Sequence, residues 1–347
     1  MKLPLEIIIY ILEILHSWNK LKPKFLRVSK LFYLCVLPMI YRRPILKSSN
    51  FFAFMDSISS NKDLGSHIKE LDLSRIVHSG KNASVARLLK RTSKSLELFI
   101  APQSSFGFGP SIALKNCKNL KVLDLSLVSE TLNLEELFKS ISSLKDLYHL
   151  AFPRSSVEIT DFKGIVWPLK LSYLRLSGGI TDEFLMKSGV PDSVVHLEFA
   201  HCPTISDIGF HHLLAKLGKN LISLRVQYPM PGLRSNALDL AFFYCPNLIS
   251  LEVTVDYISS SFFDEQNLTY LDYPRPLKYL YIESSGMLGT TTRLDPVDLA
   301  LAISESRLPH LKKVKCSAKL GWDPKSEYVS YIVDHLNDKD GGFYIGY

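Results

Sequence analysis

The side chains that most often hold metals or form covalent intermediates are scattered along this 347-residue chain. Its five cysteines are Cys35, Cys117, Cys202, Cys245 and Cys316. An odd number of cysteines without a CxxC pair predicts neither a disulfide framework nor a zinc site, and favours small buried side chains in a reducing compartment. The ten histidines lack ligand spacing, and His211-His212 falls on a helical pattern that favours packing or surface exposure. We predict no metal and no cofactor.

Motifs for nucleotide binding and hydrolysis are also missing or incomplete. Gly107-Phe108-Gly109 lacks the third glycine and the helix start of a dinucleotide fingerprint, and no P-loop, HExxH or GxSxG occurs. The chain is therefore predicted not to be an enzyme. Without these motifs, the function to look for is non-covalent binding of another molecule. Where such binding could occur depends on the helices and strands that position the side chains.

The segment Val194–Leu217 holds one predicted strand and one predicted helix. Val194, Leu197 and Phe199 form an LxxLxL triplet, in which alternating side chains point to one buried face. Asp207 is expected to cap a helix whose apolar residues recur at helical spacing. A unit this short cannot bury its apolar face alone, so it requires similar neighbours.

Ten such triplets recur at spacings of 23 to 34 residues. Their middle residues are Leu71, Phe99, Leu123, Leu150, Leu174, Leu197, Leu224, Leu251, Leu280 and Val314. They resemble leucine-rich repeats, which recur every ~20–29 residues. The segment Ile205–Gly209 after Cys202 resembles the cysteine-containing subclass of that family, and Ile180-Thr181-Asp182 matches it in part. The resemblance covers residues 66–317 and implies an α/β horseshoe solenoid of about ten repeats, with repeat lengths that resemble fungal members.

The first fifty residues account for the whole net positive charge of the chain. They hold nine of its 41 basic and two of its 34 acidic residues, which leaves 32 of each kind beyond them. A neutral repeat array does not predict nucleic-acid binding, despite a pI of 9.0. No apolar stretch reaches the ~18 residues of a membrane span, and Pro4, Glu6 and Glu13 interrupt the apolar start, so no membrane contact and no secretory signal are predicted.

The same fifty residues are predicted to form short helices. An apolar stripe runs from Ile7 to Leu15, a second helix begins near Pro23, Ser29 caps a third, and Pro38 opens a last turn. So small a segment cannot bury this much apolar surface internally. Part of it should face another protein, and its basic rim favours an acidic one.

Three segments of this region resemble the F-box family in order and spacing. They are Leu3-Pro4-Leu5-Glu6-Ile7, Leu26-Arg27-Val28-Ser29-Lys30-Leu31-Phe32 and Pro38-Met39-Ile40-Tyr41-Arg42. The resemblance implies an F-box domain over residues 1–45 that binds the Skp-family adaptor of an SCF ubiquitin ligase and, through it, the cullin and RING subunits. The contacts carried over by position are Leu3, Pro4, Ile7, Ile8, Ile11, Leu15, Leu26, Val28, Ser29, Tyr41 and Arg42. The alternative is that these helices only cap the repeats.

A second binding face follows from strand geometry. The residues between the buried positions of each triplet project from the opposite side of the sheet, on the concave face. Later repeats gather tyrosine and arginine there, which are enriched at interface hot spots. The predicted substrate-binding residues are His149, Tyr173, Arg175, His196, Arg225, Gln227, Tyr279 and Tyr281. The alternative is a solvated face whose opposite charges pair along the row.

The remaining segments are predicted to connect or close the array. Residues 46–65 should form a connecting helix, and residues 318–347 a capping helix with an apolar tail that lies across the last repeats or reaches the concave face. The irregular segments Tyr228–Arg234 and Ser284–Asp295 either connect repeats or add to the binding face.

Together these features predict the substrate-recognition subunit of an SCF ubiquitin ligase. Such a subunit promotes ubiquitination and degradation of a bound protein by proximity. The expected compartment is the cytoplasm, the nucleus or both. Two alternatives stay open: a leucine-rich-repeat scaffold without a role in ubiquitin transfer, and a nucleic-acid-binding repeat protein, which the neutral array disfavours.

Overall fold

The computed structural model describes residues 3–77, 82–103, 106–157, 159, 161–287 and 294–346. The contacts divide the chain into two units. The first unit contains residues 1–157 and 166–170, and the second contains residues 158–165 and 171–347. Among the described residues, no helix is long and apolar enough to cross a membrane.

The first unit begins with helices that pack through a narrow apolar strip. Helix α1 spans Leu5–Ser17, a 3₁₀ turn spans Pro23–Arg27, and α2 spans Lys30–Arg42. The Ser29 hydroxyl caps α2 by accepting a hydrogen bond from the Phe32 amide at 3.1 Å, as predicted. Leu12 on α1 is buried together with Val36 and Leu37 on α2, so these side chains hold the helices together.

One prediction in this region was wrong. Pro38 does not open a new turn, because α2 continues through it to Arg42. A proline inside a helix removes a backbone hydrogen bond to the carbonyl four residues earlier. Here that residue is Leu34, which is exposed, as is Pro38 itself, while the preceding Val36 and Leu37 are buried. Their packing holds the helix across the missing bond.

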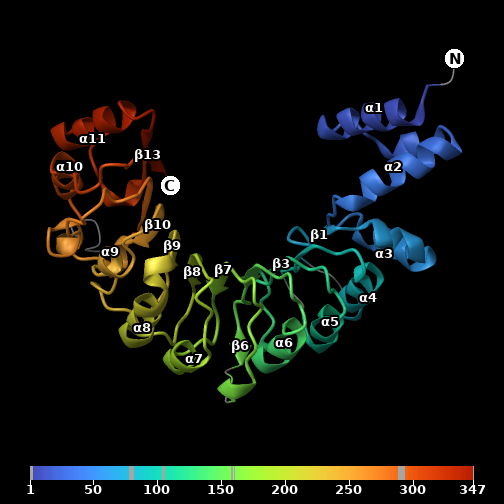
Figure 1. Cartoon of the computed structure of the whole chain (residues 1–347), viewed down its shortest axis with the longest axis horizontal. Helices are drawn as coiled ribbons and strands as arrows, with labels where there is room; N and C mark the ends of the chain where they lie inside the picture. The colour runs from blue at the N-terminus through green and yellow to red at the C-terminus, as the bar shows by residue number, and fades with distance from the viewer. Residues whose placement is uncertain are drawn as a thin grey trace. The chain divides into compact units, whose positions relative to one another are not determined.

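The rest of the first unit is a small parallel sheet with its helices on one side (Figure 1). Helix α3 spans Phe51–Ser60 and leads through a 3₁₀ turn, Lys62–His67, into the sheet. The sheet strands are β1 Glu70–Asp72, β2 Leu98–Ile100, β3 Val122–Asp124 and β5 His149–Ala151. The helices between them are α4 Asn82–Thr92, α5 Phe108–Leu114 and α6 Leu134–Ile141. Two further short strands, β4 Leu132–Asn133 and β6 Ser156–Val157, pair with each other.

The second unit repeats this arrangement with longer strands, all parallel. The strands are β7 Tyr173–Leu176, β8 His196–Ala200, β9 Ser223–Gln227, β10 Ser250–Thr254, β11 Tyr279–Glu283, β12 Lys313–Ser317 and β13 Gly342–Gly346. The helices are α7 Asp182–Lys187, α8 Asp207–Leu217, α9 Ala241–Tyr244, α10 Pro296–Ser304 and α11 Glu327–Asn337. Short 3₁₀ turns span Phe162–Gly164, Gly218–Asn220, Val255–Tyr257, Ser260–Phe263 and Ala318–Leu320.

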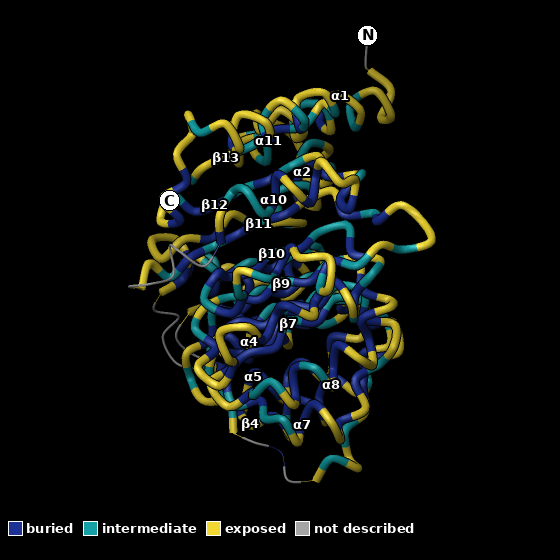
Figure 2. Tube along the Cα trace, turned by 90° about the vertical axis from the view of Figure 1, so that its left-hand side faces the viewer, coloured by how far each residue is buried: buried dark blue, intermediate teal, exposed yellow. Residues whose placement is uncertain are grey.

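Each of the ten triplets forms a strand, and the middle residues are buried and in register within each unit. Leu71 faces Phe99 and Leu197 faces Leu224, for example, and all four are fully buried or nearly so. Figure 2 shows the strands β7, β9 and β10 in the buried interior, with exposed turns around them. The spacing of the triplets therefore sets the register, since each repeat places its apolar residues over those of the last.

Helix α8 shows how the motif after the strand works. Ser206, not Asp207, is the cap: its hydroxyl accepts from the Ile208 amide at 3.2 Å. Asp207 is the first helical residue and forms an ion pair with Arg234 at 3.3 Å. Gly209 is required by close packing, because a Cβ there would lie 2.2 Å from the Asp182 carboxylate. The expected cap was one residue too late, and the glycine marks the contact with the preceding repeat.

The C-terminal tail adds a strand that the triplet pattern does not contain. β13 pairs in parallel with β12, and Lys315 lies opposite Tyr344. The Phe343 ring stacks on Trp322 with centroids 6.2 Å apart. The tail therefore extends the sheet and does not cross its face; Tyr347 and residues 288–293 of the second irregular segment lie outside the described residues.

Candidate functional site

The first candidate surface is the outer face of the N-terminal helices. Leu3, Ile7 and Ile11 are 59%, 45% and 43% exposed, whereas Leu12 on the opposite face of α1 is 1% exposed. An apolar face of this kind on a basic segment is typical of a protein-binding surface. The helix exposes it because apolar residues occupy both of its faces and the neighbouring helix covers only one.

The other predicted adaptor contacts divide into exposed and half-buried side chains. Pro4, Val28, Ser29 and Arg42 are exposed. Ile8, Leu15, Leu26 and Tyr41 are half-buried. Burial raises the pKa of Tyr41, and its ring stacks on Phe54 with centroids 6.2 Å apart. The half-buried members therefore combine packing within this unit with partial exposure to a partner.

The exposed apolar surface is larger than the predicted set. Sequence reasoning missed the exposed residues Leu5, Tyr10, Trp18, Leu31, Tyr33, Leu34 and Ile45. A groove of about 540 Å³ also lies beside them, with Leu21, Pro23, Leu26, Tyr41 and Phe54 among its lining residues. The unbroken apolar run Ile7–Leu12 was the available signal, because one helix face cannot bury all of it.

The second candidate surface lies on β7 to β10, where a buried carboxylate gathers the predicted residues. Glu198 is 3% exposed. Its Oε2 accepts a hydrogen bond from the Tyr173 hydroxyl at 2.5 Å, and its Oε1 lies 3.2 Å from Arg175 Nη1 and 3.8 Å from Arg225 Nη1. With its amide oriented to satisfy both neighbours, Gln227 donates to Glu198 Oε1 at 3.2 Å. The structure thus brings together four of the predicted residues around Glu198, which the prediction did not include.

The network continues to the next strand through Arg225. Its Nε lies 2.7 Å from Glu252 Oε1. Burial raises the pKa of Glu252, with smaller contributions from the negative charges of Glu283 and Glu198, while Arg225 opposes the rise. Arginine and glutamate therefore alternate along this row, and the pairing of opposite charges expected in the alternative interpretation is present here.

Of the remaining predicted substrate contacts, three lie on strands of the second unit and one lies in the first unit. The His196 ring lies 6.4 Å from the Tyr173 ring, centroid to centroid. Tyr281 is opposite Glu252 in the sheet, and Tyr279 on the same strand is 39% exposed. His149 is half-buried on β5 of the first unit. The second unit therefore holds one continuous set of aromatic and charged side chains on β7 to β11.

The side chains on β7 to β11 are of the kinds that bind other proteins. Arg225 keeps 42% of its side chain exposed and can donate hydrogen bonds, and the tyrosines offer ring faces and hydroxyls. Among the described residues, no group of three or more histidine, cysteine or acidic side chains is arranged to hold a metal. Sequence reasoning missed Glu198 and Glu252 as site residues, although their alternation with arginines at repeat spacing was a readable signal.

Comparison with known proteins gives one match that covers the N-terminal helices and two that cover most of the chain. Residues 1–79 match the family model described as the COS11 F-box domain. The chain is 48% identical over 326 residues to F-box protein YDR306C of Saccharomyces cerevisiae, covering 93% of this chain and 68% of that protein. It is 34% identical over 347 residues to Protein pof5 of Schizosaccharomyces pombe, covering 99% and 98%.

A solved structure is also similar in part. A chain in the crystal structure of the Rad7 and Elc1 complex in yeast aligns with a TM-score of 0.38 and 15% identity, over 94% of this chain and 95% of that one. The two relatives that match across most of this sequence, together with the F-box model on its N-terminal helices, show that this chain belongs to the F-box protein family.

Proposed function

We propose that this protein is the substrate receptor of an SCF-type ubiquitin ligase. The exposed apolar surface of α1 and the residues just before it carries the proposal, because Leu3, Ile7 and Ile11 would otherwise remain in water. In F-box proteins this segment binds a Skp-family adaptor, which would connect the chain to the cullin and RING subunits. Residues 1–45 are assigned to that contact.

The residues after the connecting segment, 46–65, are assigned to a leucine-rich-repeat array over residues 66–317, closed by residues 318–347. The ten strands support this assignment, because they are in register within each unit and their middle residues are buried. We place the substrate-binding face on β7 to β11, where aromatic and charged side chains share one side of the sheet. His149, on β5 of the first unit, is proposed as a contact by itself, because it occupies the equivalent position of its own repeat. Four buried cysteines favour the cytoplasm or nucleus.

Co-purification with a Skp-family adaptor tests the proposal. The full chain should retain the adaptor, and an Ile7→Asp, Ile11→Asp variant should lose it while keeping its helical circular dichroism. Leu169→Asp is the matched control, because Leu169 is 86% exposed but lies outside the N-terminal helices. Retention by the control and loss by the double variant support the receptor.

The fate of the captured protein separates the receptor from a scaffold. If a protein retained on the chain has a shorter half-life in cells with the wild type than with the Ile7→Asp, Ile11→Asp variant, the receptor function holds. An unchanged half-life, or a folded wild type that never retains the adaptor, identifies a repeat scaffold.

A further inference from the structure

The residues immediately before the strands form a row across each sheet, which we call the pre-strand row. In the first unit it contains Lys69, Glu97 and Lys121 before β1, β2 and β3. The Glu97 carboxylate binds both ammonium groups, each at 2.8 Å. Hydrogen bonds from Lys121 and Lys69 lower the pKa of Glu97 to about 2. In this unit a carboxylate within the row pairs with both lysines.

The pre-strand row of the second unit has no such carboxylate. Lys278 and Lys312 stand before β11 and β12, and the Lys312 amide donates to the Lys278 carbonyl at 3.0 Å, so they are direct neighbours. Ile249 precedes this pair in the row and Gly341 follows it. Among the described residues, no carboxylate lies within 4.0 Å of either ammonium group. Like charges on adjacent strands destabilise a sheet unless something lies between them.

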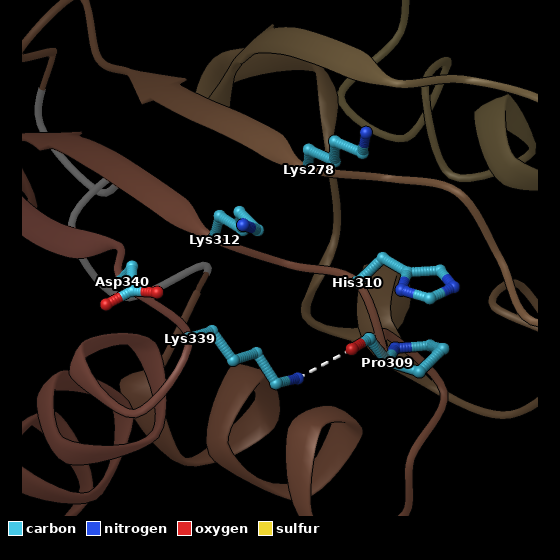
Figure 3. Close-up of a pocket in the computed structure, with 6 residues that line it drawn as sticks. All are labelled: Lys278, Pro309, His310, Lys312, Lys339 and Asp340. Carbon is cyan, nitrogen blue, oxygen red and sulfur yellow. Dashed lines mark hydrogen bonds between the residues drawn. The ribbon is translucent and has the colours of Figure 1, made fainter.

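A pocket of about 380 Å³ opens beside this pair, lined also by Pro309, His310, Lys339 and Asp340 (Figure 3). Lys339 Nζ donates to the Pro309 carbonyl at 2.6 Å, and burial lowers the pKa of Lys339. Figure 3 shows Asp340 and His310 on opposite sides of Lys312. With histidine neutral, three lysines and one aspartate leave the lining with a charge of about two positive units.

We propose that this pocket binds a phosphate monoester. Such a group carries a charge of about −1.5 to −2 at pH 7 and three acceptor oxygens, which match the charge and the ammonium donors of the lining. It would place between Lys278 and Lys312 the negative charge that Glu97 supplies in the first unit. A nucleic acid fits less well, because the neighbouring row positions are uncharged and offer no track for successive phosphates.

The ligand can be a free phosphate compound or a phosphorylated side chain of a bound protein. Isothermal titration of the full chain with inositol hexakisphosphate, inorganic phosphate and a degenerate phosphoserine peptide library, beside the unphosphorylated library, separates the two sources. Binding of the small anions alone identifies a free ligand, and binding that depends on the phosphopeptide identifies a protein ligand. Absence of binding by every phosphorylated probe overturns the proposal.

Variants of the pre-strand row test whether the pocket is the site. Lys278→Gln and Lys312→Gln should each weaken binding about tenfold. The matched control is the single variant Lys69→Gln, and likewise Lys121→Gln, which removes the same one positive charge from the same row of the first unit and should leave binding unchanged. An equal loss in this control would mean that net charge, not the pocket, attracts the probe.

Lys278→Glu separates binding from folding. It should recreate beside Lys312 the pair that Glu97 forms with Lys121, so the variant should unfold at a higher urea concentration than the wild type while binding is abolished. A variant that still binds as the wild type does would overturn the proposal. Adaptor retention should be unchanged in all these variants, so failure here leaves the ligase receptor proposal standing.

Discussion

The Tyr173 hydroxyl donates a hydrogen bond to the Glu198 carboxylate at 2.5 Å, across the boundary between β7 and β8. Because Glu198 also contacts Arg175 on β7 and Arg225 on β9, this one buried carboxylate on β8 fixes side chains from both flanking strands. A partner that binds this face meets side chains already held in position, which lowers the entropy lost on binding.

Replacing Glu198 by glutamine should therefore destabilise the fold by about 2–3 kcal/mol, because two guanidinium groups lose their shared counter-charge in a partly buried place. Tyr173→Phe, which keeps the carboxylate and removes one hydrogen bond, should cost about 1 kcal/mol. Urea unfolding followed by circular dichroism measures both. A smaller loss for Glu198→Gln than for Tyr173→Phe would contradict the central role of the carboxylate.

Glu252 should make stability depend on pH in the direction opposite to a usual ion-paired carboxylate. Burial raises its pKa from the ordinary 4.5, so the folded state holds this proton more tightly than the unfolded state. Its contribution to stability is then fully present below pH 4.5 and is lost as pH rises through the raised pKa. The unfolding free energy of the wild type minus that of Glu252→Gln should therefore become more negative from pH 4 to pH 7, because only the wild type loses this contribution. If this value instead becomes more positive over the same range, the ion pair with Arg225 outweighs the effect of burial.

The two faces of α1 should respond differently to the same kind of truncation. Leu12→Ala removes a buried contact with α2 and should cost about 2–4 kcal/mol. Ile7→Ala on the exposed face should change stability by less than about 0.5 kcal/mol. Hydrogen exchange of the α1 amides measures both effects locally. If the α1 amides were equally protected from exchange in Leu12→Ala and Ile7→Ala, the stability of α1 would not depend on the burial of Leu12.

Gly341 should tolerate no side chain. A Cβ at this position would lie 1.8 Å from the Lys312 carbonyl oxygen, in the backbone of the preceding repeat. Gly341→Ala should cost about 2 kcal/mol or more and should expose the β13 amides to hydrogen exchange. Gly109→Ala is the control, since its nearest neighbour would be 3.6 Å away and alanine favours the helix. It should leave stability unchanged or slightly higher.

The strands were predictable because their signal repeats. A single LxxLxL triplet is ambiguous, but ten at similar spacing fix both the strand positions and the register of buried residues such as Leu224 and Leu251. β13 was not predictable in the same way, because Gly342–Gly346 has no such triplet and takes its place only by pairing with β12. The cap of α8 was misplaced by one residue because Ser206 and Asp207 are both good capping residues and only backbone geometry distinguishes them.

The sequence predicts which side of the strands forms the binding face, but it does not predict that Glu198 is buried there. Strand alternation places Glu198 on the side opposite the core, which suggests exposure to solvent. Arg175, Tyr173 and Arg225 are longer than the spacing between neighbouring strands, about 4.8 Å, and they close over the carboxylate. No alternation pattern carries this information, because it depends on which side chains happen to flank a position in space. The N-terminal contacts remain predictions, although most of them lie on exposed or half-exposed surface.

Four cysteine thiols are buried, and burial raises the pKa of each to about 12: Cys117, Cys202, Cys245 and Cys316. Because the thiolate is the form that reacts, alkylating reagents can modify these residues only when the surrounding segment opens. Of these four buried cysteines, Cys117 lies in the first unit and the other three lie in separate repeats of the second. The chain thus contains four native reporters of local opening, and their order of labelling would show where unfolding begins.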